Sequence, residues 1–296
     1  MKLLVTGATS FVGAHFCRRA AERHEVYALA HRTPMGLPNV RTIYIDLAAP
    51  EAVPRLRLLE VDAVVHLACK VMGTGWGHEH PTAAGRLNRA MMDAVLALGR
   101  PVLYGSSTCV HWPSDTGYAR GRREDEARLA ASGLPWAAVR PSAPYGPPLI
   151  GHRPTHPESF HTLAKWVQTR PVVPIPGRGR ALRQPVHVDD LSDAMLALLE
   201  RGLPGAAFDV GGADALSFRQ IVEAIAAAAG RRTRIAPIPL GLLAIAGRVL
   251  PDLEPALLSA ADTDDIADSE MIIEVTGLHP RTFVEGVSDL LIVKKP

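Results

Sequence analysis

Apolar residues along this chain follow two alternating patterns, short continuous runs and longer segments with helical spacing. The short runs, typical of buried strands, are Leu3–Thr6, Glu25–Ala30, Thr42–Ile45, Ala63–Leu67, Val102–Ser106, Ala137–Arg140 and Ala206–Val210. The segments with helical spacing or strong helix formers are Phe11–Arg23, Glu51–Leu59, Pro81–Leu98, Tyr118–Ala131, Leu191–Leu199 and Phe218–Ala229. This alternation predicts an α/β fold with a doubly wound parallel sheet.

The first strand runs into a turn in which small residues recur at every third position. Gly7, Ser10 and Gly13 match a G-x-x-G-x-x-G nucleotide-binding turn, with Ser10 where a glycine is usual. Small residues are needed because the backbone passes close to a pyrophosphate, and the following helix directs its unpaired N–H groups at that anion. The turn predicts dinucleotide binding, and the alternative is a tight turn without a ligand. The residues expected to bind the dinucleotide here are Gly7, Thr9, Ser10, Phe11, Val12 and Gly13.

The end of the second strand bears on which dinucleotide binds. NAD-binding folds usually place a carboxylate there to hold the adenosine ribose, whereas this chain has Ala30, His31 and Arg32. An arginine pairs with a ribose 2′-phosphate, so NADP(H) is favoured over NAD(H). The alternative is that Arg32 is a solvated loop charge. Asp46 and Leu47, after the third strand, are placed to meet the adenine, unless Asp46 is only a helix N-cap.

Composition describes an ordinary globular enzyme acting on a small molecule. The chain has 296 residues, of which 47% are hydrophobic and 21% charged, and its net charge of +2 includes no dense basic run. No nucleic-acid partner is expected. Cys17, Cys69 and Cys109 are isolated and form no disulfide framework, which indicates a reducing compartment. No signal peptide is visible, and two prolines and an arginine interrupt the apolar segment Ile235–Leu250, so a cytoplasmic protein without a membrane partner is expected.

The character of the chain changes after the sixth predicted strand. Six prolines lie between Pro141 and Pro157, as in a loop over an active-site mouth. Residues 1–145, with 185–210 returning to them, are expected to form a dinucleotide-binding domain. Residues 146–184 and 211–296 are expected to form a smaller, C-terminal substrate lobe.

Polar residues also follow the fifth predicted strand: Ser106, Ser107 and Thr108, then Tyr118 and Arg122. Six segments occur in the order TGATSFVG, VDAVVHLAC, SSTCV, YARGR, RPSAPYGP and GRGRALRQPVHVDD. With these segments the chain resembles, over nearly its whole length, the extended short-chain dehydrogenase/reductase superfamily. That group includes nucleotide-sugar epimerases, dehydratases and 4-keto-sugar reductases, and the resemblance implies a Rossmann sheet with a bound NAD(P).

The resemblance implies a role for each of these residues. Tyr118 would move a proton to or from a carbinol or carbonyl during hydride transfer, with nearby positive charge lowering the phenol pKa. Thr108 would orient the substrate oxygen, and Arg183 would clamp the pyrophosphate of a nucleotide sugar. The further cofactor contacts implied are Leu67, Ala68, Cys69, Tyr118, Arg122 and Pro141. The further substrate contacts implied are Lys70 and Trp76.

Arg122 is the main departure from the superfamily, which has a lysine four residues after the tyrosine. A guanidinium keeps the positive charge but is not equivalent to an ammonium. Arg122 substitutes for the lysine, or Lys70 supplies the charge, or the protein is a non-catalytic dinucleotide sensor. Ser10 is compatible with binding, because its hydroxyl donates to a phosphate or caps the helix.

The substrate pocket departs from the superfamily as well. Tyr118 follows Thr108 by only ten positions, and His111-Trp112 replace the usual tyrosine-glycine. Both changes alter the pocket wall, so the substrate does not transfer directly from the family.

Other polar residues have structural alternatives. In this arginine-rich chain Arg183 has the alternative of a solvated basic loop, and Trp76 that of a packing residue. Asp189 and Asp190 are interpreted as partners of a helix N-terminus. The histidines have no metal-ligand spacing, so no metal site is expected.

The expected function is therefore that of an NADP(H)-preferring oxidoreductase or epimerase, with a nucleotide-linked keto-sugar as the favoured substrate class. A reductase of a smaller carbonyl compound, a non-catalytic dinucleotide sensor and a scaffold are the alternatives. A homodimer is expected through the helices 81–98 and 118–131. The apolar residues that would contribute to its interface, or else pack on the sheet, are Met91, Met92, Val95 and Leu96.

Overall fold

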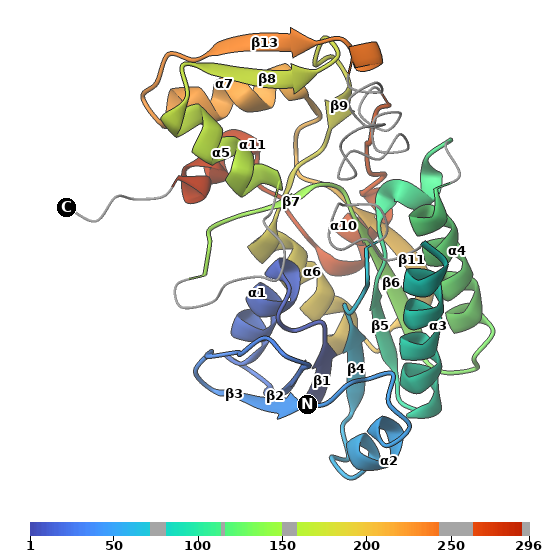
Figure 1. The fold of residues 1–296 in the computed structure, drawn as a ribbon. Helices are drawn as coiled ribbons and strands as arrows, with labels where there is room; N and C mark the ends of the chain where they lie inside the picture. Colours follow the sequence, from blue (N-terminus) through green and yellow to red (C-terminus); the bar gives the residue numbers. More distant parts are fainter. Residues whose placement is uncertain (72–80, 114–115, 150–158, 243–262, 292–296) are drawn as a thin grey trace.

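The computed structural model describes residues 1–71, 81–113, 116–149, 159–242 and 263–291. At its centre lies a seven-stranded sheet with the order β11-β6-β5-β4-β1-β2-β3 (Figure 1), and every pair of neighbours is parallel. The strands are β1 Lys2–Thr6, β2 Glu25–Ala30, β3 Val40–Tyr44, β4 Ala63–His66, β5 Val102–Gly105, β6 Trp136–Pro141 and β11 Pro204–Val210. This confirms the predicted doubly wound sheet. The chain direction across the sheet reverses between β1 and β4, where such sheets bind their ligands.

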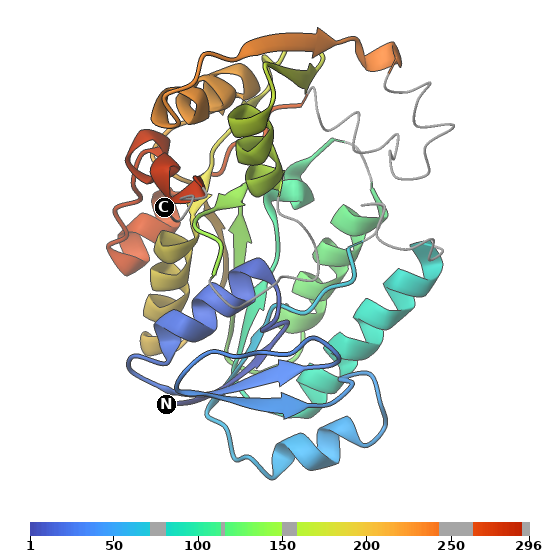
Figure 2. The same cartoon turned by 60° about the vertical axis from the view of Figure 1, so that its left-hand side comes forward.

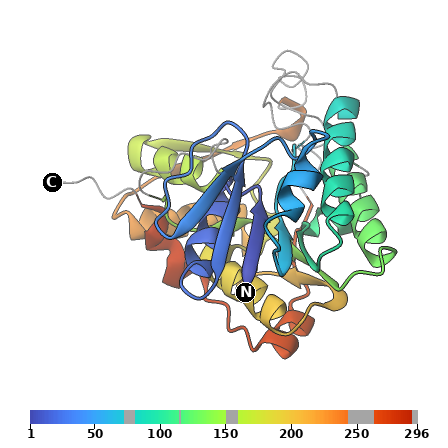
Figure 3. The same ribbon diagram turned by 90° about the horizontal axis from the view of Figure 1, so that it is seen from below.

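Helices cover both faces of the sheet (Figure 3), which is why its strands are continuously apolar. One face carries α1 (Phe11–Ala20), α6 (Val188–Glu200) and α10 (Glu270–Thr276). The other face carries α2 (Ala52–Arg57), α3 (Pro81–Ala97) and α4 (Gly117–Ala130). Successive residues of β1 serve the two layers: Leu3 and Val5 pack with Phe16 of α1, and Leu4 packs with Met92 of α3.

A second, smaller core lies beyond the carboxyl ends of the sheet strands (Figures 1 and 2). Its larger elements are α5 (Ser159–Thr169), α7 (Phe218–Ala228), α11 (Phe283–Gly286) and the parallel pair β8 (Val172–Pro176) and β13 (Arg234–Ile238). Its short elements are β7 (Pro144–Tyr145) paired with β10 (Val186–His187), β9 (Leu182–Arg183) paired with β12 (Leu216–Ser217), and the 3₁₀ turn η2 (Val287–Leu290). This lobe therefore faces the edge of the sheet at which the predicted site residues gather.

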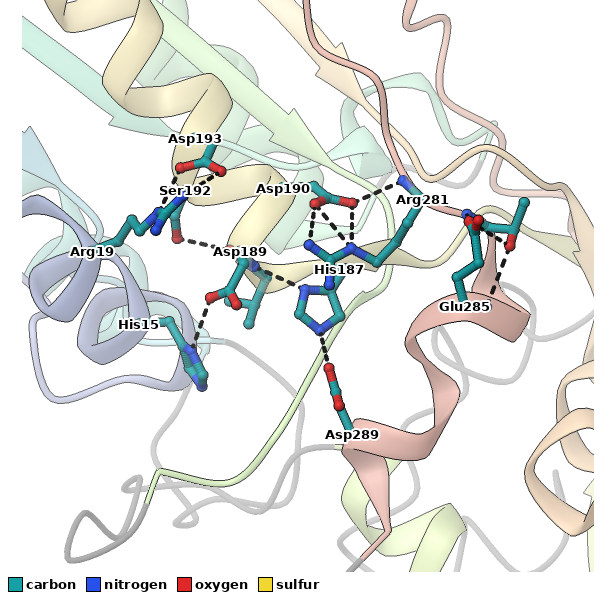
Figure 4. Close-up of polar contacts among 12 residues, drawn as sticks. His15, Arg19, His187, Asp189, Asp190, Ser192, Asp193, Arg281, Glu285 and Asp289 are labelled. Carbon is teal, nitrogen blue, oxygen red and sulfur yellow. Dashed lines mark hydrogen bonds and ion pairs between the residues drawn. The ribbon is translucent and has the colours of Figure 1, made fainter. Parts of the chain in front are cut away.

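A group of charged and histidine side chains joins the lobe to the sheet domain at the start of α6 (Figure 4). Arg281 donates to Asp190 from Nε (3.0 Å) and Nη2 (2.7 Å), and its backbone N–H also binds that carboxylate (2.9 Å). Beside it, buried His187 accepts from the N–H of Asp189 at Nδ1 and so donates from Nε2 to Asp289 (3.1 Å). Asp189 and Asp190 thus lie in the first turn of α6, a favourable place for carboxylates, as predicted, whereas the partner Arg281 was not predicted.

Four details differ from the sequence-based expectations. The third strand is Val40–Tyr44, and α6 begins at Val188, because the preceding histidine caps the helix. The proline-rich stretch predicted as a loop contains β7. Met91, Met92 and Val95 are buried in the core between α3 and the sheet, so they do not form an exposed apolar face on α3. In the described part of the chain no helix is both long and apolar enough to cross a membrane.

Candidate cofactor and catalytic site

The glycine-marked turn lies where β1 meets the segment after β4. Gly7 has φ +66°, and a Cβ there would stand 2.4 Å from the backbone nitrogen of Ala68. A Cβ on Gly13 would stand 2.2 Å from the carbonyl oxygen of Gly7. Both glycines are therefore required by the close passage of backbone, as the sequence pattern indicated.

The start of α1 leaves donors for an anion. The Ser10 hydroxyl accepts from the N–H of Gly13 (3.0 Å), so it caps the helix. Within the described residues, the N–H groups of Phe11 and Val12 bind no acceptor. They are the first two N–H groups of the helix, which have no partner inside it. The turn thus fits the pyrophosphate of a dinucleotide.

The adenosine end of the expected cofactor site lies beyond β2. His31 and Arg32 are exposed, and His31 Nε2 lies 4.0 Å from Asp46 Oδ2. Asp46 accepts from the N–H of Ala48 (3.0 Å), so it shapes the turn after β3 and does not cap α2. Leu47 is buried in the core beneath this turn.

The segment after β4 runs along the turn and then meets α3. The N–H of Ala68 donates to Thr6 Oγ1 (3.2 Å), while the Asn88 side chain binds the backbone of Lys70 at both N–H (2.7 Å) and carbonyl (2.9 Å). Asn88 orients this segment but was missed by the sequence reasoning, because a single asparagine in an amphipathic helix carries no distinctive signal. Burial raises the pKa of the Cys69 thiol, so that side chain is neutral at pH 7.

Tyr118 and Arg122 are brought together by one turn of α4. Thr116 caps this helix through the N–H of Ala119 (3.0 Å), which places Tyr118 in the first turn. Arg122, only 7% exposed, donates from Nη2 to the Tyr118 oxygen (3.2 Å), and its guanidinium lies 5.0 Å from the centre of that ring. Arg122 thus contacts the phenol directly, as the pair in the sequence implied.

Burial changes the protonation of this region. It raises the pKa of Tyr118 above its ordinary value, and the Arg122 guanidinium offsets only part of that rise. Arg122 lowers the pKa of Tyr118, as expected of a nearby cation, but burial raises that pKa by more. Burial, aided by Arg122, lowers the pKa of His66 to about 3. At pH 7 the phenol is protonated and His66 is neutral.

The hydroxyl groups after β5 point in different directions. Thr108 is 2% exposed, and its Oγ1 donates to the carbonyl of Pro141 (3.4 Å). Ser107 is less buried, and its Oγ accepts from the N–H of Cys109 (3.3 Å) at the start of the 3₁₀ turn η1 (Thr108–His111). The Thr108 hydroxyl therefore donates its hydrogen to the backbone, whereas the Ser107 hydroxyl acts as an acceptor and can still donate its hydrogen. Ser107 was passed over in the sequence although it stands in the same Ser-Ser-Thr group.

Below these hydroxyls a chain of charged groups fixes the ends of β5 and β6. Ser106 donates to Glu126 (2.5 Å), which also accepts two bonds from Arg140 (2.5 and 2.9 Å). Arg140 in turn lies 3.4 Å from Asp209 of β11, and His111 lies 2.9 Å from the same carboxylate. His111, one of the two residues that depart from the superfamily, is thus tied to β11.

A cavity of about 410 Å³ opens between α3 and α4 and reaches Tyr118 and Arg122. Two charged side chains on its wall, Arg89 of α3 and Glu124 of α4, form an ion pair (3.0 Å). Cys69, Asn88, Gly85 and Gly121 also line the cavity. The cavity gives an approach to the Tyr118 phenol from the helical side.

Arg183 and Trp76 were the other predicted substrate residues. Arg183 of β9 donates from Nη1 to the carbonyls of Leu182 and Thr263, both at 2.7 Å, so this nitrogen holds backbone segments together. Burial lowers the pKa of Arg183. Trp76 lies outside the described residues. Among the residues described, no group of three or more histidine, cysteine or acidic side chains could hold a metal ion.

The sheet and the turn define a class, an α/β enzyme with a dinucleotide site at the carboxyl ends of β1 and β4. The model of the NAD dependent epimerase/dehydratase family matches residues 3–211, and the chain belongs to that family. The resemblance drawn from the sequence is thereby confirmed, and the relatives of this chain are epimerases, reductases and dehydratases.

Three relatives illustrate the range. A dTDP-4-dehydro-6-deoxy-D-allose reductase of Streptomyces bikiniensis is 26% identical over 271 residues, which cover 79% of this chain and 82% of that protein. A ceramide reductase of Caulobacter vibrioides is 27% identical over 246 residues, covering 79% and 73%. The crystal structure of a UDP-glucose 4-epimerase of Thermotoga maritima with UDP-glucose matches with a TM-score of 0.78 at 18% identity, over 98% of this chain and 97% of that one.

Proposed function

We propose that this enzyme is an NADP(H)-preferring reductase that transfers hydride to the carbonyl of a nucleotide-linked keto-sugar, with Tyr118 as the proton donor. The observation that carries the proposal is the state of Tyr118. Its pKa is raised by burial, and its oxygen accepts from Arg122, so the phenol hydrogen remains available to a substrate oxygen. A neutral acid suits reduction, in which an alkoxide must be protonated.

The residues of the chain divide the work as follows. The N–H groups of Phe11 and Val12 bind the pyrophosphate, and Arg32 binds a ribose 2′-phosphate. Bound NADPH supplies the hydride. Arg122 stabilises the phenolate left on Tyr118 after the proton has gone, since its guanidinium already lies at the oxygen. Ser107, rather than Thr108, donates to the substrate oxygen, because the Thr108 hydroxyl is bound to Pro141.

The experiment begins with titration of the purified enzyme with NADPH and NADH by fluorescence, and with an assay for cofactor released on denaturation. NADPH binding to an enzyme purified without cofactor, followed by turnover of a keto-sugar nucleotide, would support an exchanging reductase. Retained NAD would favour an epimerase or dehydratase instead. Absence of binding to either dinucleotide would contradict the proposal altogether.

Three variants test the assignment of roles. Tyr118→Phe should lower kcat by about 100-fold or more while NADPH affinity stays within about twofold. Ser107→Ala should lower kcat/KM by at least tenfold, and Thr108→Val by less, because one substrate-facing hydrogen bond is lost only in the former. Equal turnover by Tyr118→Phe and wild type would show that another group donates the proton, and binding of NADPH without turnover by either would leave a dinucleotide sensor as the better explanation.

A second candidate is a reductase of a carbonyl compound without a nucleotide. The observation in its favour is that Arg183, the expected pyrophosphate clamp, already binds two backbone carbonyls through Nη1. The similarity to a ceramide reductase points the same way. Arg183→Ala distinguishes the two: a KM increase confined to nucleotide substrates would support the first candidate.

Assembly and compartment complete the proposal. We expect a homodimer through α3 and α4, and sedimentation of the purified enzyme tests it. The described cysteines are all free thiols, which supports a reducing compartment such as the cytoplasm.

A further inference from the structure

Tyr104 is the one polar side chain within β5, and it is 1% exposed. A phenylalanine would fill the same space, so the buried hydroxyl requires an explanation. Its oxygen accepts from Arg122 Nη1 (2.8 Å) and donates its hydrogen to Asp125 Oδ2 (3.0 Å). The phenol therefore stands between the guanidinium and a carboxylate on the same helix.

Arg122 depends on few partners for its orientation. Nη1 binds the Tyr104 oxygen and the carbonyl of Gly105 (2.7 Å), while Nη2 binds Tyr118. Nε is buried without a partner among the described residues. The Cys69 side chain is a further hydrogen-bond partner of the guanidinium. Besides it, the two acceptors that hold Nη1 keep the guanidinium at Tyr118.

Asp125 is the natural competitor for this guanidinium. Its side chain is 14% exposed, and its other oxygen, Oδ1, lies 3.6 Å from Arg128 Nη1. A planar guanidinium prefers a carboxylate, which it can bind with two hydrogen bonds, to a phenol. Only the Tyr104 oxygen separates the two groups. Without it, Asp125 would attract Arg122 away from Tyr118.

We propose that Tyr104 is a positioning residue of the site: its phenol donates a hydrogen bond to Asp125 and accepts one from Arg122, and so keeps the guanidinium directed at the Tyr118 oxygen. This inference rests on the proposed function, in which Tyr118 is the proton donor. It also explains how an arginine serves where the superfamily has a lysine. The longer, forked side chain needs an acceptor on its far side, and Tyr104 supplies one.

The test measures the ionisation of Tyr118 directly. Protein labelled with 3-fluorotyrosine is titrated by fluorine NMR, and the Tyr118 resonance is assigned by its loss in Tyr118→Phe. The other titratable groups that face Tyr118 are Arg122, Cys69 and Cys109, and neither Tyr104→Phe nor Asp125→Asn changes any of them. A change in the titration therefore reports the position of the guanidinium.

Three variants are compared with wild type: Tyr104→Phe, Asp125→Asn and the double variant. Tyr104→Phe should weaken the acidity of Tyr118 about tenfold, because the guanidinium moves toward Asp125. The double variant should recover most of that change, since the neutral amide attracts Arg122 far less. Asp125→Asn alone should leave Tyr118 within about twofold of wild type.

A merely structural role for Tyr104 would lower the melting temperature of Tyr104→Phe without moving the Tyr118 titration, and would overturn the proposal. So would a double variant as perturbed as Tyr104→Phe. If Tyr104→Phe fails to fold, Arg122→Lys replaces it: an ammonium cannot span Tyr104 and Tyr118, so the acidity of Tyr118 should fall similarly. An unchanged titration there would also overturn the proposal. These measurements need neither cofactor nor substrate, so failure of the proposed function would show separately, as wild type that binds no dinucleotide.

Discussion

Truncation of Arg281 to alanine would break the contact that holds the C-terminal lobe to α6. Arg281 binds Asp190 through Nε, Nη2 and its backbone N–H, and Asp190 is only 7% exposed (Figure 4). In Arg281→Ala the carboxylate keeps the backbone N–H as its partner and loses the cation. The change thus leaves a buried charge without its counter-charge, which is the costly way to break an ion pair.

The expected loss in the free energy of unfolding is about 3 kcal/mol, at the lower end for buried pairs because the Arg281 side chain is itself 34% exposed. For a chain of this length that corresponds to a fall of about 5 °C in Tm. Asp190→Asn combined with Arg281→Ala should regain about 1 kcal/mol, because the neutral amide still accepts from the backbone N–H.

Urea denaturation followed by circular dichroism at pH 7 measures these differences. Arg89→Ala is the matched control: it removes an ion pair with Glu124 whose side chains are 60% and 50% exposed. Exposed pairs contribute about 1 kcal/mol or less. The reasoning is refuted if Arg281→Ala is no more destabilised than Arg89→Ala, or if adding Asp190→Asn deepens the loss.

Three further predictions concern the cofactor turn and pH. Arg32→Glu should weaken NADPH binding about tenfold or more in fluorescence titrations and leave NADH binding nearly unchanged, because a carboxylate repels the 2′-phosphate; equal loss for both dinucleotides would contradict it. The contact with His15, whose Nδ1 lies 3.7 Å from the carboxylate, is the largest cause that lowers the pKa of Asp189, from 3.8 to about 2. Because the folded value is the lower one, this stabilisation of about 1–2 kcal/mol is complete above pH 3.8, is lost as pH falls through about 2, and should be absent from acid denaturation curves of Asp189→Asn. Gly13→Ala should abolish dinucleotide binding, since its Cβ would stand 2.2 Å from the carbonyl oxygen of Gly7; binding within threefold of wild type would refute this.

The sequence alone determined the sheet, the order of its elements and the turn that fits a dinucleotide. The apolar runs, the helical spacing and the recurrence of Gly7, Ser10 and Gly13 can be read from residues close together in the chain, although the backbone that Gly7 passes belongs to Leu67 and Ala68. Tyr118 and Arg122 were also readable, because residues four apart on a helix lie side by side.

Only the tertiary structure decided which hydroxyl and which charge meet. Arg281 and Asp190 are 91 positions apart, and Tyr104 and Arg122 are 18 apart on different elements. Nothing in the periodicity of a segment states which partner a buried polar atom will have, since that depends on how strands from distant parts of the chain are ordered in the sheet. For the same reason the sequence favoured Thr108, whose hydroxyl the fold turns toward a backbone carbonyl. The local pattern thus determines where the site lies, and the packing of distant elements determines which atoms can act in it.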